Sequence, residues 1–192
     1  MKTESELYAL QYIEYLIEEI KALPMKQIIE IAEVLHQAQL KGKHIFIFGN
    51  GGSAAAAAHI TCDLGKNTRL PEQPRLKVIS LVDSISSLTA YANDEGYENV
   101  FSEPLLSLAE LGDVAIAISG SGNSPNVLKA VETAKHLGVT TIGLTGFEGG
   151  KLKSMVDICV VVPSNNIERI EDIHLIINHL ITGLLRSTAK CT

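Results

Sequence analysis

Residues 44–64 read HIFIFGNGGSAAAAAHITCDL, an apolar run followed by closely spaced glycines and then a run of alanines. The segment 44–48 is short and rich in strand-forming residues, so it predicts a buried strand. The glycines predict a tight turn, and the alanines predict a helix that begins at Ser53, a residue type favoured at the N-cap. Strand, glycine turn and helix in this order make the first unit of an α/β fold.

The same alternation continues toward the C-terminus. Further apolar runs predict strands at 78–82, 114–118, 140–144 and 158–162. The helices expected from periodicity are 53–64, 86–92, 99–108, 124–136 and 167–186. Because the strands are continuously apolar and helices separate them, we expect an α/β fold with a doubly wound, five-stranded parallel sheet, covered by helices on both faces.

A pair of helices is expected ahead of this core. Apolar residues from Leu7 to Ile20 recur at spacings of three and four, and Pro24 suits the first turn of a second helix that stops at Gly42. We therefore expect a single domain over residues 1–192, with the helical pair at 1–42 and the α/β core at 43–192. The pair fits two uses: oligomerisation through the same pair of another subunit, or covering the chain's own sheet.

Composition narrows the class of protein. The 192 residues carry a net charge of −6, which gives no electrostatic footprint for nucleic acid. The apolar runs are shorter than the ~20 residues that a membrane-spanning helix needs, and the first residues do not resemble a signal peptide. Cys62, Cys159 and Cys191 are scattered, as is typical of reduced thiols. We expect a cytoplasmic protein that binds neither nucleic acid nor membrane.

Two loops rich in glycine and serine follow the first and third expected strands. They read GNGGS at 49–53 and SGSGNS at 119–124, and each leads into a helix. Helix N-termini attract anions, glycine lets the backbone approach a ligand, and serine hydroxyls add donors. One such loop is equally well explained as a tight turn, but two at strand ends favour phosphate binding. The lysine of a P-loop and the GxGxxG pattern of dinucleotide folds are both missing from them.

Several motifs together resemble a known family. They are GNGGSAAAAAH (49–59), AYANDEGYENVFS (90–102), SGSGNS (119–124), LTGFEGGKL (144–152) and RIEDIH (169–174). With these motifs, the chain resembles the sugar isomerase (SIS) domain family over essentially its whole length. Within it, the similarity is to phosphoheptose isomerases, which convert sedoheptulose 7-phosphate to glycero-manno-heptose 7-phosphate. The resemblance implies a homotetramer with active sites at subunit interfaces.

The resemblance also implies roles for individual residues. The residues implied in substrate binding are Asn50, Gly51, Gly52, Ser53, Asn93, Asp94, Ser119, Gly120, Ser121, Ser124 and Glu171. A divalent metal, with zinc as the expected ion, is implied at His59, Asp63, Glu171 and His179, and Asp63 and His179 are also implied to be catalytic. The family has threonine, glutamate, arginine and glutamine where this chain has Gly120, Asp63, Asn67 and Glu171.

The spacing of these residues can be read without the resemblance. Isomerising a sugar needs a base and a group that stabilises an enediolate, and His59 and Asp63 lie on one helix face beside the first glycine loop. Glu171 and His179 are separated by ~12 Å along a regular helix, which makes a shared ligand difficult within one subunit. His174 and Asn178 share another face and fit an ordinary interface, so only the resemblance favours His179 over His174.

Two functions remain from the sequence. The first is a metal-assisted aldose–ketose isomerase acting on a sugar phosphate, with sedoheptulose 7-phosphate as the expected substrate. The alternative is a non-catalytic SIS protein that binds a sugar phosphate or a protein partner such as the replication initiator. Aspartate is shorter than glutamate by one methylene, which can retract a base by ~1 Å and cost about a hundredfold in rate. The departures at Asp63 and Glu171 are therefore what keeps the alternative open.

Overall fold

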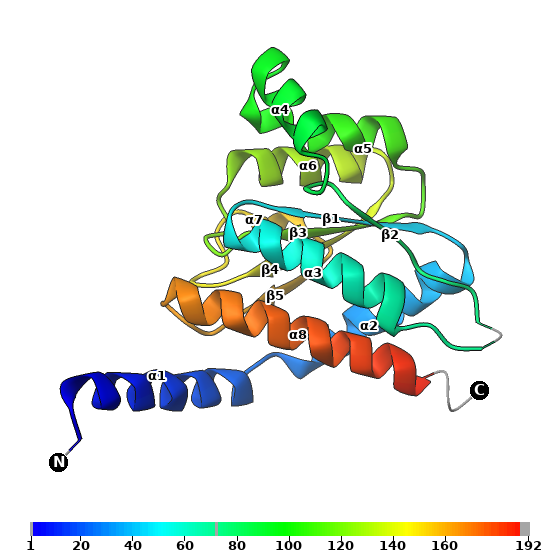
Figure 1. Ribbon diagram of the computed structural model, residues 1–192. Coiled ribbons are helices and arrows are strands. Elements are labelled where there is room, and N and C mark those ends of the chain that lie inside the picture. The colour runs from blue at the N-terminus through cyan, green and yellow to red at the C-terminus, as the bar shows by residue number, and fades with distance from the viewer. Residues whose placement is uncertain (1, 72, 189–192) are drawn as a thin grey trace.

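The computed structural model describes residues 2–71 and 73–188 (Figure 1). Five strands follow the two N-terminal helices, and helices connect them. The strands are β1 (His44–Gly49), β2 (Lys77–Ser80), β3 (Val114–Ile118), β4 (Thr140–Thr145) and β5 (Ile158–Val161). The helices are α1 (Glu4–Lys21), α2 (Met25–Leu40), α3 (Gly52–Asn67), α4 (Ile85–Asp94), η1 (Tyr97–Asn99), α5 (Ser102–Leu108), α6 (Pro125–His136), α7 (Leu152–Met155) and α8 (Ile167–Thr188).

The strands form one parallel sheet in the order β2-β1-β3-β4-β5, which confirms the expected fold class. Successive side chains of β1 point to opposite faces, and both faces are buried. Ile45 and Ile47 pack with α2, α3 and α8, whereas Phe46 and Phe48 pack with α5, α6 and α7. Figure 1 shows these two helical layers on either side of the sheet.

The two N-terminal helices have different environments. In α2, Ile28, Ile31 and Leu35 are fully buried in the core, so this helix covers the chain's own sheet. In α1 no residue is buried, and only a few side chains near its end, such as Leu16 and Ile20, pack partly against that core. The helical pair therefore does not act as one unit, because α2 belongs to the core and α1 lies outside it (Figure 1).

Several local expectations are corrected. Helix α3 has Gly51 at its N-cap, with φ +56°, so Ser53 is not the cap but a buried residue in the first turn. The helix expected at 99–108 is divided into η1 and α5, because Pro104 lacks an N–H and fits only the first turn of a helix that begins near it. Strand β2 ends at Ser80, and the four-residue α7 was not expected.

Two expectations from composition can be compared with the described chain. Cys62 and Cys159 are free thiols, and Cys191 lies outside the described residues. Within residues 2–71 and 73–188, no helix combines the length and apolar character that crossing a bilayer requires.

Candidate functional site

The strand order places two loops next to each other at one end of the sheet. The chain leaves β1 toward β2, while β3 lies on the other side of β1, so the connections diverge there. Gly49 and Ile118 are paired at the carboxyl ends of β1 and β3. In open α/β sheets, ligands bind at such a switch point. The structure thus brings together the two glycine- and serine-rich loops that the sequence singled out.

A pair of amides joins the two loops. Asn50 donates to Asn126 over 2.8 Å, and Asn126 donates back to the Asn50 oxygen over 2.9 Å. The Tyr97 hydroxyl also donates to this Asn50 oxygen. Asn126 is buried, and sequence reasoning missed it, although its place directly after SGSGNSP is a signal that could have found it. The Asn50 side chain thus holds the loop in shape.

The second loop carries the serines expected to surround a phosphate. The Ser119 and Ser124 hydroxyls lie 3.1 Å apart, and Ser124 stands at the N-cap of α6 without a side-chain capping bond. The Ser121 hydroxyl accepts from the backbone N–H of Asn123. A side chain at Gly120 would have its Cβ 2.6 Å from Cδ1 of Ile167. Gly120 therefore makes room for the first residue of α8.

The segment with Asn93 and Asp94 lies farther along the chain, at the end of α4. The Asn93 amide donates to Asp94 over 2.7 Å, and both side chains are exposed. Tyr97 connects the segment that follows to Asn50 in the first loop. Asn93 and Asp94 are free to face a ligand, and their role in substrate binding stays a prediction.

Three of the four expected metal ligands converge. His59 and Asp63 lie one turn apart on α3, and His179 lies on α8, which packs against α3. The Asp63 Oδ2 atom is 3.1 Å from Nε2 of His59 and 3.4 Å from Nε2 of His179, and these two nitrogens are 3.2 Å apart. Asp63 is buried, whereas the histidine side chains are 46% and 58% exposed. The cluster therefore opens to solvent on its histidine side.

Glu171, the fourth expected ligand, lies outside this three-residue group. Its carboxylate lies directly against Gly52, so closely that a Cβ at position 52 would collide with it. A groove of about 310 Å³ is bordered by Glu171, Gly52 and His59. Glu171 is thus positioned beside the first loop and the groove, rather than on the convergence point of His59, Asp63 and His179.

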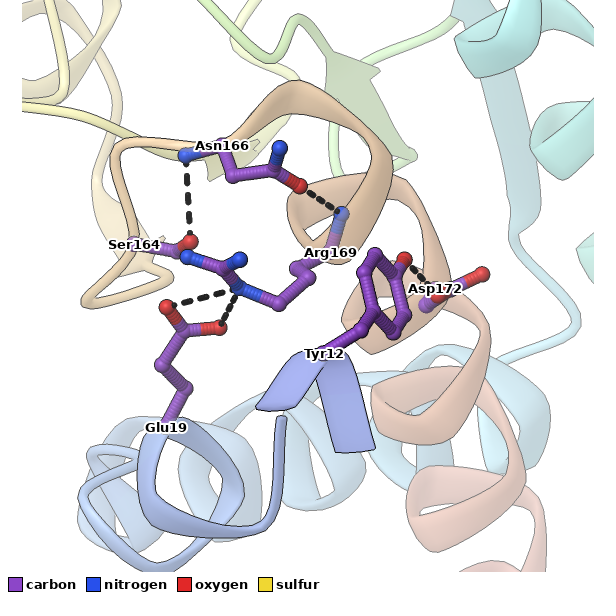
Figure 2. A network of polar contacts seen from close by, with 6 residues as sticks. All are labelled: Tyr12, Glu19, Ser164, Asn166, Arg169 and Asp172. Atoms are coloured by element: carbon purple, nitrogen blue, oxygen red, sulfur yellow. Dashed lines mark hydrogen bonds and ion pairs between the residues drawn. The ribbon is translucent and has the colours of Figure 1, made fainter. Parts of the chain in front are cut away.

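Helix α1 is fastened to the beginning of α8 on both sides of Glu171 in the sequence. Figure 2 shows Arg169 bonded to Glu19, at 2.9 and 3.1 Å from its two carboxylate oxygens, and Tyr12 donating to Asp172 over 2.6 Å. The Arg169 guanidinium also lies 5.8 Å from the centre of the Tyr12 ring. The hydrogen bond to Asp172, with burial and nearby charge, raises the pKa of Tyr12 to about 12. These contacts hold the first turns of α8, which carry Glu171.

His174 and Asn178, which fitted an interface in the sequence, are buried inside the chain. The His174 Nε2 atom lies 3.2 Å from the carbonyl oxygen of Thr145, which marks Nε2 as the protonated nitrogen. Asn178 instead donates to Asp63 over 2.7 Å. His174 thus takes a structural position at the end of β4, and the histidine on the site is His179.

We expect the buried His174 to destabilise the fold in acid. Burial is the main cause that lowers the pKa of His174 to about 4, partly offset by the bond to Thr145. Because the unfolded histidine takes up a proton at about pH 6.5, stability is lost as the pH falls from there to about 4, by about 3 kcal/mol in total. Urea unfolding measured across this range would check the loss. His174→Gln, which keeps a donor for Thr145 but does not titrate, should flatten the dependence; an equally steep dependence in that variant would contradict the assignment.

The chain is similar to known proteins over most of its length. Residues 10–146 match the pattern of the SIS domain family. The chain is 41% identical over 170 residues to the phosphoheptose isomerase of Trichlorobacter lovleyi, covering 88% of this chain and 86% of that one. It is 47% identical to that of Helicobacter pylori over 137 residues, 71% of each chain. The structure of phosphoheptose isomerase from Neisseria gonorrhoeae superposes with a TM-score of 0.88 at 32% identity, covering 96% of this chain and all of that one (100%).

Proposed function

Because the chain belongs to the SIS domain family and is similar to phosphoheptose isomerases over most of its length, we propose that it is a sugar-phosphate isomerase that converts sedoheptulose 7-phosphate to D-glycero-D-manno-heptose 7-phosphate. The observation that carries this proposal is the convergence of His59, Asp63 and His179, two of which lie on the helix that leaves the first glycine-rich loop. The alternative, a non-catalytic protein that binds a sugar phosphate or the replication initiator, is not favoured, since the relatives that match most of the chain are named as isomerases.

The three-residue cluster fits a divalent metal such as zinc. Tetrahedral zinc with bonds of 2.0–2.1 Å brings its donor atoms to ~3.3 Å from one another. The three donor atoms here are separated by 3.1, 3.2 and 3.4 Å. Imidazole nitrogens with one carboxylate oxygen are a ligand set that zinc accepts, and the exposed histidine side leaves a position open for substrate. A metal held there would polarise the sugar carbonyl.

The chain's own residues divide the proton transfers between them. Asp63 takes a proton from C1 of the ketose and delivers a proton to C2 of the enediol, so the same carboxylate serves both carbons. His179, whose side chain is 58% exposed, relays the other proton from O1 to O2 through Nδ1, because its Nε2 atom faces the convergence point. Ser119, Ser121 and Ser124, with the N-terminus of α6, hold the phosphate at the switch point.

Glu171 belongs to the substrate side of this proposal. Its carboxylate faces the groove shared with Gly52 and His59, where it can accept hydrogen bonds from sugar hydroxyls. Asn93 and Asp94 supply further polar groups for the chain of the sugar. An acidic residue in this groove suits a polyhydroxylated substrate, since the hydroxyls offer donors and the carboxylate only accepts.

A homotetramer remains part of the proposal. The apolar side chains Leu7, Ile13 and Ile17 of α1 are exposed in the single chain, and another subunit is the surface that would cover them. A cytoplasmic location is proposed with it, on the grounds of the free thiols Cys62 and Cys159.

The assay for this function uses the purified full chain loaded with Zn²⁺. We expect NMR to show conversion of sedoheptulose 7-phosphate to the aldose, and in D₂O to show deuterium at C2 of the product because the transferred proton exchanges on the base. Fructose 6-phosphate serves as the shorter ketose for comparison. If the metal-loaded chain turned over neither sugar, the isomerase function would be rejected.

A further inference from the structure

The carboxylate of Asp63 is held from two sides by asparagine amides. Asn67, one turn farther along α3, donates to Oδ1 over 2.8 Å, and Asn178 of α8 donates to Oδ2 over 2.7 Å. Each oxygen thus receives one N–H, and each oxygen has a second lone pair. The second lone pair of Oδ2 remains for the side where His59 and His179 lie.

Asn178 is a polar residue at a buried position, where it lowers the stability of the fold. Its exposed fraction is 2%, and its Oδ1 atom has no hydrogen-bond partner among the described residues. It borders a cavity of about 10 Å³ whose other lining residues are isoleucines and leucines. A buried, unpaired amide oxygen destabilises the fold, so an aliphatic side chain would suit this core better. Packing does not account for the asparagine, and its contact with Asp63 does.

Asn67 and Asn178 together form a clamp on the Asp63 carboxylate. This clamp lies where the sequence departs from the pattern of the family it resembles. By the resemblance described above, Asp63 stands where phosphoheptose isomerases have the longer glutamate, and Asn67 stands where they have arginine. A shorter side chain has less reach with which to correct a misplaced carboxylate, so hydrogen bonds that set its orientation matter more. Two neutral amide donors fix it without adding a positive charge that would compete with a cation for the same oxygens.

We propose that Asn178 and Asn67 are positioning residues that orient the Asp63 carboxylate toward the convergence point of His59 and His179. The inference rests on the proposed function, because it takes that point to be a metal site. Ligands oriented by such outer hydrogen bonds lose affinity for the metal by about 10- to 100-fold when the outer partner is removed. Neither asparagine is expected to touch the sugar.

The test replaces Asn178 with leucine, which keeps the branched shape and removes the donor. We expect Asn178→Leu to bind Co²⁺ about 10- to 100-fold more weakly and to change its visible absorption bands, which report the ligand geometry. In the zinc-loaded enzyme kcat should fall while KM for the sugar phosphate stays unchanged. Thr182→Val is the matched control, since Thr182 is also buried on α8 and its hydroxyl has no hydrogen-bond partner, Asp63 included, among the described residues.

The outcomes separate the two proposals. A folded Asn178→Leu variant with the Co²⁺ affinity and spectrum of the wild type would overturn the clamp while leaving the isomerase function intact. A loss of the same size in Thr182→Val would also overturn it, because any disturbance of α8 would then suffice. If Asn178→Leu does not fold, Asn67→Ala tests the other arm at a half-buried position, with a weaker Co²⁺ affinity expected and an unchanged affinity contradicting the clamp. A wild type that binds no Co²⁺ would overturn both the clamp and the metal site.

Discussion

Asp63→Asn is expected to lower kcat for the isomerisation by about 10³-fold or more. The substitution removes the base that carries the proton between C1 and C2, and it removes the anionic donor of the three-residue cluster. It also places an amide N–H₂ against the amides of Asn67 and Asn178, both of which need an acceptor. Conversion of sedoheptulose 7-phosphate followed by NMR at saturating Zn²⁺ measures the loss.

Asp63→Glu is the comparison that isolates the carboxylate. It keeps the charge and introduces the glutamate that the family resemblance implies at this position, so it should lose less activity than Asp63→Asn. Turnover that is the same in Asp63→Asn as in the wild type would remove Asp63 from the role of base. Equal losses in the two variants would mean that the exact placement of the carboxylate matters more than its presence.

The sheet could be predicted from the sequence because its signal is local. Continuous apolar runs such as 44–48 and 114–118 predict buried parallel strands without any knowledge of their neighbours, and β1 and β3 lie at those runs. The glycine loop between β1 and α3 was equally visible. Its detail was not, since the positive φ of Gly51 starts the helix earlier and draws Ser53 into the first turn.

The site depended on contacts that a single segment does not encode. The i,i+4 spacing correctly predicted that His59 and Asp63 meet, because both lie on one helix. Asn178 approaches Asp63 from a helix 115 residues farther along the chain, and Asn126 approaches Asn50 from 76 residues away. The periodicity of α8 groups Asn178 with His174, but only the packing of α8 on α3 decides that this face is buried and that His179 turns toward the opening.

Asp63 and Glu171, the two residues that depart from the pattern of the family, lie at different places in the site. Asp63 accepts hydrogen bonds from the two asparagines, and its Oδ2 atom lies 3.1 and 3.4 Å from the Nε2 atoms of His59 and His179. Glu171 lies in the first turns of α8, and the neighbouring residues Arg169 and Asp172 bind these turns to α1 (Figure 2). The two substitutions therefore act on different sides of the site, one at the convergence point and one at the groove.

The loop at 119–124, which is proposed to hold the phosphate, depends on a close backbone contact at Gly122. Gly122 has φ +66°, and a Cβ there would collide with the carbonyl oxygen of Gly149 in the loop after β4. The two loops are joined through the backbone at the same place, since the N–H of Leu152 donates to the Gly122 oxygen over 3.0 Å. Because the obstacle is backbone on both sides, no rotamer change can relieve it.

Gly122→Ala is therefore expected to destabilise the fold by about 3 kcal/mol, from the left-handed backbone conformation and the overpacking together. The same change displaces Ser121 and Ser124 from the phosphate, so kcat/KM should fall about 100-fold even where the variant is folded. Urea unfolding gives the first quantity and the isomerase assay gives the second. Gly65→Ala is the matched control: apart from the nearby backbone of α3, no atom of the described residues lies within 4 Å of a Cβ built there, and alanine in the last turn of α3 should stabilise the chain by about 0.5 kcal/mol. Wild-type stability and activity in Gly122→Ala would show that the loops can separate, and the phosphate would then have to be held by the first loop and Ser53 instead.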